Sequence, residues 1–213
     1  MITVHHLDDS RSQRILWLLE ELGLSYDITQ HKRDPNTRLA PSELRKIHPL
    51  GKSPVIENDG RVVAESGAII DYILRKFGNG RLQPSPSDIH YDDYVHWMHY
   101  AEGSAMPALI IRINVARIGE AASPALPRLD SEIALHLEYL NNALDGRPYI
   151  VGDQLTAADI QLSFVGELAA ARFGISRYPN IEAWVHRFLR AIIRARACSC
   201  KSLSSEFIVA ERP

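Results

Sequence analysis

The sequence predicts an α/β domain followed by an all-α domain, and three observations lead to this fold class. Residues 2–77 alternate strand-like and helix-like patterns in the order βαβαββα. Residues 78–88 have the Gly, Pro and Ser content of a linker. Beyond them, apolar residues recur every three or four positions, which is typical of packed helices. We therefore expect one domain over 1–78, a linker over 79–87 and a second domain over 88–213.

Charge and hydropathy exclude several classes of protein. The 213 residues carry a net charge of −2, a balance that implies no affinity for nucleic acid or for a membrane surface. No window reaches about 18 uncharged apolar residues, and the N-terminus lacks the apolar run of an export signal. The two cysteines, Cys198 and Cys200, are too close together to close a useful loop and lack the partners of a zinc site. A soluble, cytoplasmic protein without a bound metal is expected.

The first elements of the chain are a short strand over 2–6 and a helix over 10–23. In the helix, leucines and an isoleucine recur at helical spacing, and a glycine follows the last turn. A strand over 26–29, a polar stretch over 31–39 and a short helix from about Ser42 come next. A strand, a crossover helix and a parallel strand in this order form a right-handed unit.

Residues 51–66 contain a hairpin followed by the start of a helix. Two β-branched pairs flank an Asn-Asp-Gly turn, the strongest short-range signal for a tight hairpin. Pro54 stands at the first strand position, where a residue without an N–H is tolerated, and a cis bond before it fits this place. Glu65 and Ser66 then precede an apolar helical run. The unpaired N–H groups and the positive dipole end of that helix favour an anion, so a carboxylate-bearing ligand fits there.

The second domain is predicted to be a bundle of helices. A long helix over 88–119, kinked at Pro107, and a second over 124–144 are expected to pair in an antiparallel arrangement. Thr156 and Asp159 form a variant capping box at the start of a further helix. Their expected role is structural, because capping is favoured over acid catalysis for an aspartate in this position.

Taken together, these motifs resemble those of the cytosolic glutathione transferases. The proline before the third strand, the Glu-Ser pair that begins the third helix and the Thr-x-x-Asp box match family motifs, and so does the segment from Pro179 to Trp184. The resemblance covers roughly residues 1–195 and implies a thioredoxin-like first domain, a helical second domain and a two-fold homodimer. It also implies a detoxifying transferase that joins its co-substrate, glutathione, to a small electrophile.

The resemblance assigns contacts with glutathione residue by residue. The backbone of Ser53 pairs with the cysteinyl part in the manner of an added strand. Glu65 and Ser66 hold the γ-glutamyl end, and Lys52 either pairs with the glycine carboxylate or is an ordinary solvated lysine. The expected glutathione-binding residues are Lys52, Ser53, Pro54, Glu65, Ser66 and Arg11.

The thiolate needs a hydrogen-bond donor near the start of the first helix. Only a small fraction of a free thiol is ionised at neutral pH, and each unit by which the pKa falls is worth about 1.4 kcal/mol. Ser10 is the first choice, because it stands at the expected N-cap, four residues before Arg14, the spacing of the Ser-type theta and delta members; Ser12 is the reserve. Ser10 either contacts the thiol or only caps the helix. His6 is a further alternative, and the absence of an early cysteine argues against thiol exchange.

The resemblance places the electrophile beside the middle of the long helix. The expected lining is His99, Glu102, Gly103, Met106 and Ile110. These side chains suit an apolar pocket with one polar side, although core packing explains Met106 and Ile110 equally well.

Two other functions are open at this point. The same fold serves as a non-catalytic protein-interaction module, although the intact Glu-Ser pair favours an enzyme. A glutathione-dependent isomerase or dehalogenase would use the same residues. The tail over 197–213 lacks helical periodicity and either is disordered or folds over the site.

Overall fold

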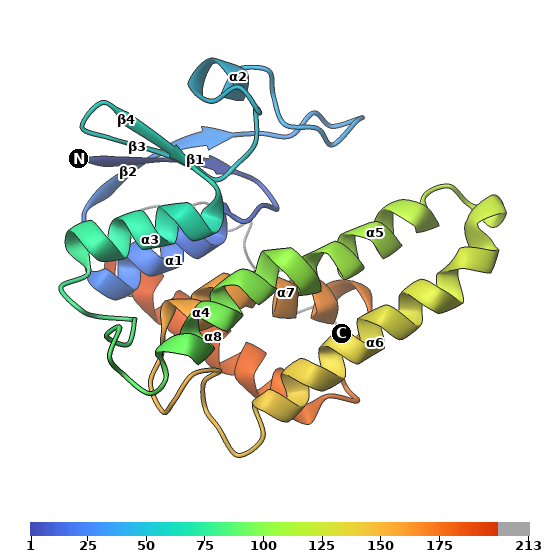
Figure 1. The fold of residues 1–213 in the computed structure, drawn as a ribbon. Helices are drawn as coiled ribbons and strands as arrows, with labels where there is room; N and C mark the ends of the chain where they lie inside the picture. The colour runs from blue at the N-terminus through green and yellow to red at the C-terminus, as the bar shows by residue number, and fades with distance from the viewer. Residues whose placement is uncertain (200–213) are drawn as a thin grey trace.

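The computed structural model describes residues 1–199, with side chains described through residue 189. The chain has the two parts that the sequence predicts, a thioredoxin-like α/β part and a helical part (Figure 1). The last helix is α8 (Pro179–Ser199), and it includes the first residues of the expected tail. The prediction that this tail lacks helical character was therefore wrong for residues 197–199. The rest of that tail, 200–213, lies outside the described residues.

The sheet has the strand order β2-β1-β3-β4. β1 (Ile2–Leu7) pairs in parallel with β2 (Tyr26–His31) and antiparallel with β3 (Val55–Asn58). β3 pairs antiparallel with β4 (Arg61–Ala64). The parallel pair requires a crossover, which α1 (Ser12–Leu22) provides. This is the order of elements that the sequence predicted.

The hairpin and the proline before it have the expected local geometry. Asp59 and Gly60 both adopt positive φ, 51° and 76°, as the tight turn between β3 and β4 requires. The Ser53–Pro54 peptide bond is cis. Glu65, just after β4, has a φ of 71° and directly precedes the next helix. The chain thus turns sharply at both ends of the hairpin.

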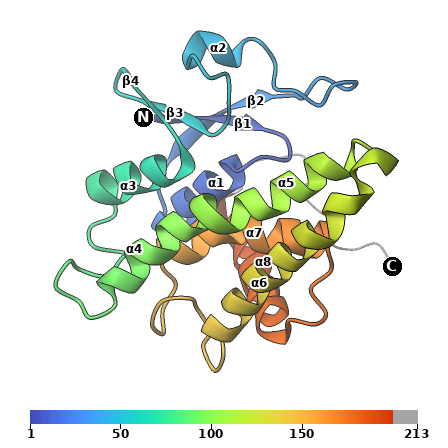
Figure 2. The ribbon, with the colours of Figure 1, turned by 45° about the vertical axis from the view of Figure 1, so that its right-hand side comes forward.

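Two helices cover one face of the sheet, and a short helix lies over the other. α1 and α3 (Ser66–Phe77) pack together on one face, and α2 (Leu44–Ile47) lies on the opposite side (Figures 1 and 2). Strand alternation explains the division, because Val4 of β1 points into the main core and His5 points the other way. His6 again faces α1, so it reaches the N-terminus of that helix.

The helical part begins with a long, nearly continuous helical segment, and a further helix runs back beside it. In chain order it consists of α4 (Tyr91–Tyr100), the π-helical turn η1 (Ala101–Ala105), α5 (Met106–Ala116), the 3-10 turn η2 (Glu120–Ala125), α6 (Leu126–Ala143), α7 (Ala157–Arg172) and α8. α4, η1 and α5 follow one another along one rod, and α6 returns beside α5 (Figure 1). Within residues 1–199, no helix combines the length and apolar character needed to cross a membrane.

Two helix predictions were wrong in detail. The helix expected over 88–119 begins at Tyr91 and ends at Ala116, and it widens into the π-helical turn η1, which ends two residues before Pro107. Since Pro107 has no N–H to donate four residues back, a regular α-helix is not maintained there. The helix expected from 124 begins at Leu126, because Pro124 lies inside the preceding 3-10 turn.

α7 begins with the capping box that the sequence predicted. Thr156 is the N-cap, and Asp159 is 0% exposed. The Asp159 carboxylate accepts hydrogen bonds from the backbone N–H of Ile150 at 2.9 Å, that of Thr156 at 3.1 Å and the indole N–H of Trp184 at 3.0 Å. Burial raises the pKa of Asp159, and these hydrogen bonds oppose the rise. The carboxylate therefore ties α7 to α8 and to the preceding loop.

A continuous hydrophobic core joins the two parts of the chain. α1 packs against α7 and α8, and the rings of Trp17 and Phe188 lie 5.6 Å apart between centroids. Both side chains are almost wholly buried. The N-terminus of α1 is thereby held in a defined place relative to the helical part.

Candidate functional site

A row of hydrogen-bonded hydroxyls lies at the N-terminus of α1. The hydroxyl oxygens of Ser10 and Ser12 are 2.7 Å apart, and that of Ser12 is 2.7 Å from Nδ1 of His6. The Ser10 hydroxyl also lies 3.4 Å from that of Ser53, which donates to the backbone carbonyl of His5 at 2.9 Å. The fold therefore brings together β1, the start of α1 and the segment before the cis-proline.

Ser10 is not the N-cap of α1, contrary to the sequence expectation. The cap is Arg11, whose backbone is already helical at φ −63° and ψ −5°. The Ser10 hydroxyl still accepts the backbone N–H of Ser12 at 3.3 Å. The difference of one residue leaves this hydroxyl beside the first N–H groups of the helix, where the dipole favours negative charge.

Ser10, Ser12 and His6 differ in their exposure to solvent. Ser10 is 6% exposed, whereas Ser12 and His6 are both at 0%. The Ser12 hydroxyl lies between His6 and Ser10 and is hydrogen-bonded to both. Of the three candidates for a contact with a thiol, Ser10 lies nearest to solvent.

Ser66, the first residue of α3, is the centre of a second group of polar contacts. Its side chain is 4% exposed, and its hydroxyl oxygen accepts from Nη1 of Arg14 and from Nε2 of Gln161, each at 3.2 Å. Because both lone pairs of this oxygen accept, its proton is left to donate. A hydroxyl donor beside the N-terminus of a helix suits a carboxylate ligand.

Arg14 places a buried positive charge behind Ser66. Its side chain is 0% exposed and forms an ion pair with Glu102 of η1, while the ring of Phe164 lies 5.7 Å below the guanidinium. Burial lowers the pKa of Arg14 to about 10, so the side chain is still protonated at neutral pH. Among the described residues, Nε and Nη2 of Arg14 have no hydrogen-bond partner. The sequence drew attention to Arg14 only through its spacing from Ser10, and nothing in the sequence indicated a role for Gln161.

Arg11 and Lys52, both expected to bind the ligand, have different surroundings. Nε of Arg11 lies 2.9 Å from a carboxylate oxygen of Glu102, so this guanidinium is bound to the helical part. Lys52 is exposed and adjoins Ser53 in the segment before Pro54. Glu65 is also exposed, with a positive φ that turns it out at the start of α3.

The residues expected around the electrophile divide into exposed and buried groups. His99 and Gly103 are exposed, and Glu102 is partly exposed between its two arginines. Met106 is 1% exposed and belongs to the hydrophobic core, and Ile110 packs against that core. For Met106, the core-packing alternative describes this structure.

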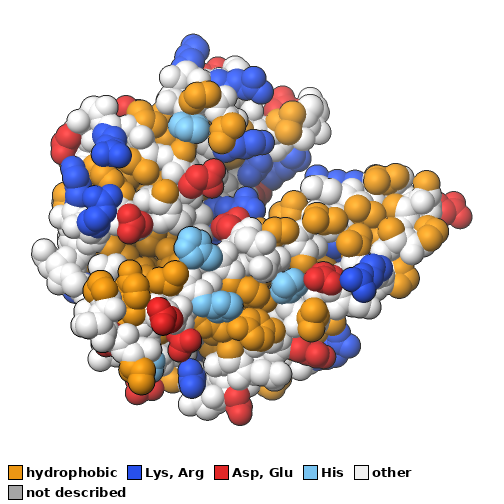
Figure 3. Space-filling view, in the orientation of Figure 1, with side chains coloured by type: hydrophobic (Ala, Val, Ile, Leu, Met, Phe, Trp, Pro, Cys, Tyr) orange, Lys and Arg blue, Asp and Glu red, His pale blue; other side chains and the backbone are white. Residues whose placement is uncertain are grey.

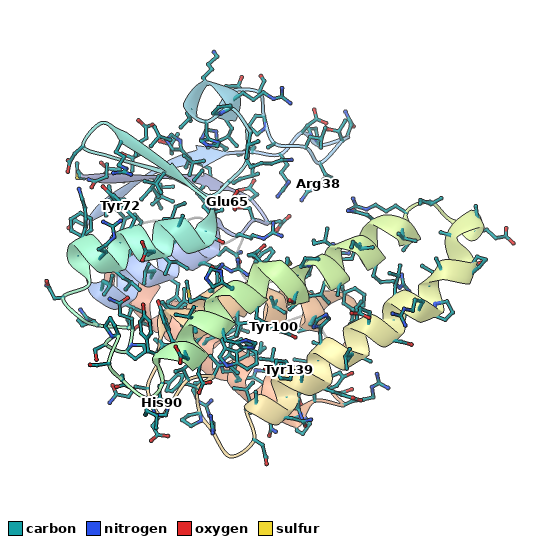
Figure 4. The ribbon with its side chains drawn as sticks, viewed as in Figure 1. Arg38, Glu65, Tyr72, His90, Tyr100 and Tyr139 are labelled. Atoms are coloured by element: carbon teal, nitrogen blue, oxygen red, sulfur yellow. The ribbon has the colours of Figure 1, made fainter. Side chains whose placement is uncertain are left out.

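The surface is hollowed between the two parts of the molecule. Figure 3 shows the hollow between the N-terminal part and the arm formed by α5 and α6. Figure 4 places Glu65 at the start of α3 and Arg38 on the loop after β2, both on the N-terminal side of this hollow. No cluster of three or more His, Cys, Asp or Glu side chains suited to a metal occurs in the part of the chain that the structure describes.

The pair of Arg14 and Glu102 gives a testable expectation for stability. Glu102→Gln keeps a hydrogen-bond acceptor but removes the charge that compensates the buried guanidinium. We expect a loss of about 2 kcal/mol, below the roughly 3–5 kcal/mol of a wholly buried pair, because the Glu102 side chain is 32% exposed. Urea unfolding measures the change, with exposed Glu138→Gln on α6 as the control. Equal free energies of unfolding for Glu102→Gln and Glu138→Gln would show that water, rather than Glu102, compensates the charge of Arg14.

Comparison with known protein families matches both parts of the chain. The model described as the N-terminal domain of glutathione S-transferase matches residues 1–75, and that of the C-terminal domain matches residues 99–191. Glutathione S-transferase 3 of Schizosaccharomyces pombe is 37% identical over 202 residues, covering 87% of this chain and 81% of the relative. Probable elongation factor 1-gamma 1 of Arabidopsis thaliana is 30% identical over 190 residues, covering 86% of this chain and 45% of that protein.

Solved structures give the same fold. A glutathione S-transferase from Actinobacillus pleuropneumoniae has a TM-score of 0.85 at 32% identity and covers 96% of this chain and 95% of its own. The glutathione transferase URE2P8 from Phanerochaete chrysosporium, crystallised with oxidized glutathione, has a TM-score of 0.77 at 21% identity, covering 94% and 97%. At that identity the second likeness shows the fold alone.

Proposed function

This chain belongs to the glutathione S-transferase family, and from that premise we propose that it is a transferase in which the Ser10 hydroxyl stabilises the thiolate of bound glutathione. This is the Ser-type mechanism of theta-like and delta-like members. The thiolate attacks an electrophilic carbon of a small, partly apolar substrate. Catalysis comes from stabilising and orienting the sulfur, without covalent attachment to the protein.

The observation that carries this proposal is the row of hydroxyls at the N-terminus of α1. If Nδ1–H of His6 donates to Ser12, and Ser12 donates to Ser10 at 2.7 Å in preference to the Leu7 carbonyl at 3.4 Å, then the Ser10 oxygen has its acceptor sites filled. Its own proton is then left to donate, and we propose that the sulfur of bound glutathione takes it in place of the long contact with Ser53 at 3.4 Å. Hydrogen bonds linked in this way polarise one another, which strengthens the last donor in the row.

The same geometry supports binding of the other parts of glutathione. The backbone of Ser53, beside the cis-proline, pairs with the cysteinyl part, and the hydroxyl of Ser66 donates to the γ-glutamyl carboxylate. The buried charge of Arg14 lies behind Ser66 and favours an anion there. Glu65 receives the γ-glutamyl amine. We assign the glycine carboxylate to Lys52.

The electrophile is proposed to enter the hollow between the N-terminal part and α5. His99, Glu102 and Ile110 form the wall offered by the helical part. Ile110 provides its apolar share, and Met106 supports the wall from the core. We also propose that the chain consists of a glutathione-binding domain over 1–78, a linker over 79–87 and a helical domain over 88–213. In the same proposal the protein is a cytoplasmic homodimer with a detoxifying role.

A non-catalytic interaction module is the second candidate. The similarity to elongation factor 1-gamma, over 86% of this chain, supports it. The two readings differ over glutathione, since an interaction module has no need of a thiolate-stabilising hydroxyl. An isomerase or dehalogenase would keep the same contacts and differ only in the electrophile.

Titration calorimetry with glutathione tests the proposal. We expect the wild type to bind glutathione below millimolar concentrations, and Ser66→Ala to bind about tenfold more weakly, because it loses a hydrogen bond to a charged group. Ser25→Ala, an exposed serine remote from the site, is the matched control. Failure of the wild type to bind glutathione at millimolar concentrations would remove the transferase proposal and favour the interaction module.

A further inference from the structure

Arg33, on the segment between β2 and α2, grips the backbone of the loop that leads to Ser10. Its Nε donates to the carbonyl oxygen of Asp8 at 2.8 Å, and its Nη2 donates to that of Asp9 at 3.0 Å. Its Nη1 donates to the carbonyl of Arg38 at 3.0 Å, within its own segment. One planar guanidinium therefore joins two backbone segments that lie 25 residues apart in the chain.

The two gripped carbonyls belong to the residues immediately before Ser10. Asp9 adopts a φ of 49°, a left-handed conformation that aspartate tolerates but does not prefer. The backbone conformation of this turn determines where Ser10 lies relative to Ser12 and Ser53. A hold on the carbonyls on either side of Asp9 opposes relaxation of the turn toward ordinary conformations.

Further contacts tie the same two segments together. Arg38 forms an ion pair with the Asp9 carboxylate, and the side-chain amide of Gln30 donates to the carboxylate of Asp8. These contacts are exposed, so each is worth little by itself. Arg33 is partly buried and makes three hydrogen bonds to backbone carbonyls, so it is the main link between the two segments.

We propose that Arg33 is a positioning residue for Ser10, and that it acts by holding the backbone of Asp8 and Asp9 so that the Ser10 hydroxyl is aimed at the thiolate. The proposal rests on the proposed transferase function. A hydrogen bond weakens steeply as its angle departs from linearity, and a displacement of about 1 Å at a reacting group costs on the order of a hundredfold in rate. The proposed role of Arg33 acts through these backbone carbonyls and requires no contact between Arg33 and glutathione.

The test follows the pKa of the thiol in bound glutathione by its thiolate absorbance, together with kcat and KM. Arg33→Ala is expected to raise that pKa by about one unit and to lower kcat about tenfold at neutral pH, with KM for glutathione within about twofold. Arg33→Lys, which offers a point donor in place of the planar fork, is expected to recover part of the loss. Arg128→Ala, whose side chain is 84% exposed, is the control and should change none of these values.

A double-variant cycle separates positioning from general weakening of the fold. If Arg33 acts through Ser10, Arg33→Ala should leave the thiol pKa unchanged in a Ser10→Ala background. An equal rise of the pKa in both backgrounds overturns the proposal. If Arg33→Ala does not fold, Arg33→Gln retains a shorter donor and serves the same comparison. A wild type that leaves the thiol pKa at its free value refutes the transferase function, and the role of Arg33 with it. A wild-type pKa that is lowered and that Arg33→Ala leaves unchanged refutes the Arg33 role alone.

Discussion

Ser10→Ala is expected to lower kcat by about a hundredfold at neutral pH and to raise the pKa of the bound glutathione thiol toward its free value. The reason is that Ser10 is the hydroxyl proposed to donate to the thiolate, and the loss of one preorganised donor to an anion costs about 10²–10³ in rate. KM for glutathione should change little, because the contacts proposed at Ser53 and Ser66 are untouched.

The measurement is a pH profile of kcat together with the thiolate absorbance of the bound state. Ser12→Ala is the informative companion, because it removes the link between His6 and Ser10 while leaving the Ser10 hydroxyl in place. We expect it to have a smaller effect than Ser10→Ala. If Ser12→Ala abolishes the lowering of the pKa and Ser10→Ala does not, then Ser12 is the hydroxyl that meets the sulfur.

Asp159→Ala is expected to destabilise the protein by about 4 kcal/mol. The change leaves the N–H groups of Ile150 and Thr156 and the indole N–H of Trp184 without their acceptor in a buried place, and each unsatisfied donor costs roughly 1–3 kcal/mol. These costs overlap, since the three donors share one carboxylate. An effect of this size is a large fraction of the stability of an ordinary domain.

Urea unfolding gives the free energy, with Asp153→Ala, an exposed aspartate in the preceding loop, as the matched control. Asp159→Asn keeps a carbonyl acceptor and should fall between the two. Glutathione binding by the folded fraction at low temperature should change little, because Asp159 itself contacts none of the proposed glutathione-binding residues and reaches Ser66 only through the position of Gln161 on α7. A loss below about 1 kcal/mol, or a loss of binding without a loss of stability, would contradict the structural role.

The sequence indicated the local features of this protein correctly where the signal was itself local. The turn between β3 and β4, the helix that starts at Ser66 and the capping box at Thr156 depend on residues within a few positions of one another. Turn and cap chemistry acts over that range, so it can be predicted without knowledge of the fold. The N-cap of α1 was displaced by one residue, which is the usual precision at helix ends.

The partners of the site residues were decided only by the tertiary structure. Arg14 meets Glu102 across 88 residues, and Gln161 meets Ser66 across 95. The sequence contains an arginine and a glutamate in many places, and none of them indicates a partner until helix packing brings the two together. The same holds for Arg33, which reads as an ordinary loop arginine.

The chain by itself therefore determined the family, the order of elements and the expected positions of Ser10, Glu65 and Ser66. Only the tertiary structure arranged the hydroxyls of Ser53, Ser10 and Ser12 in one row leading to His6. The physical reason is range: backbone conformation follows from neighbouring residues, whereas burial and hydrogen-bond partners follow from which surfaces the whole chain packs together.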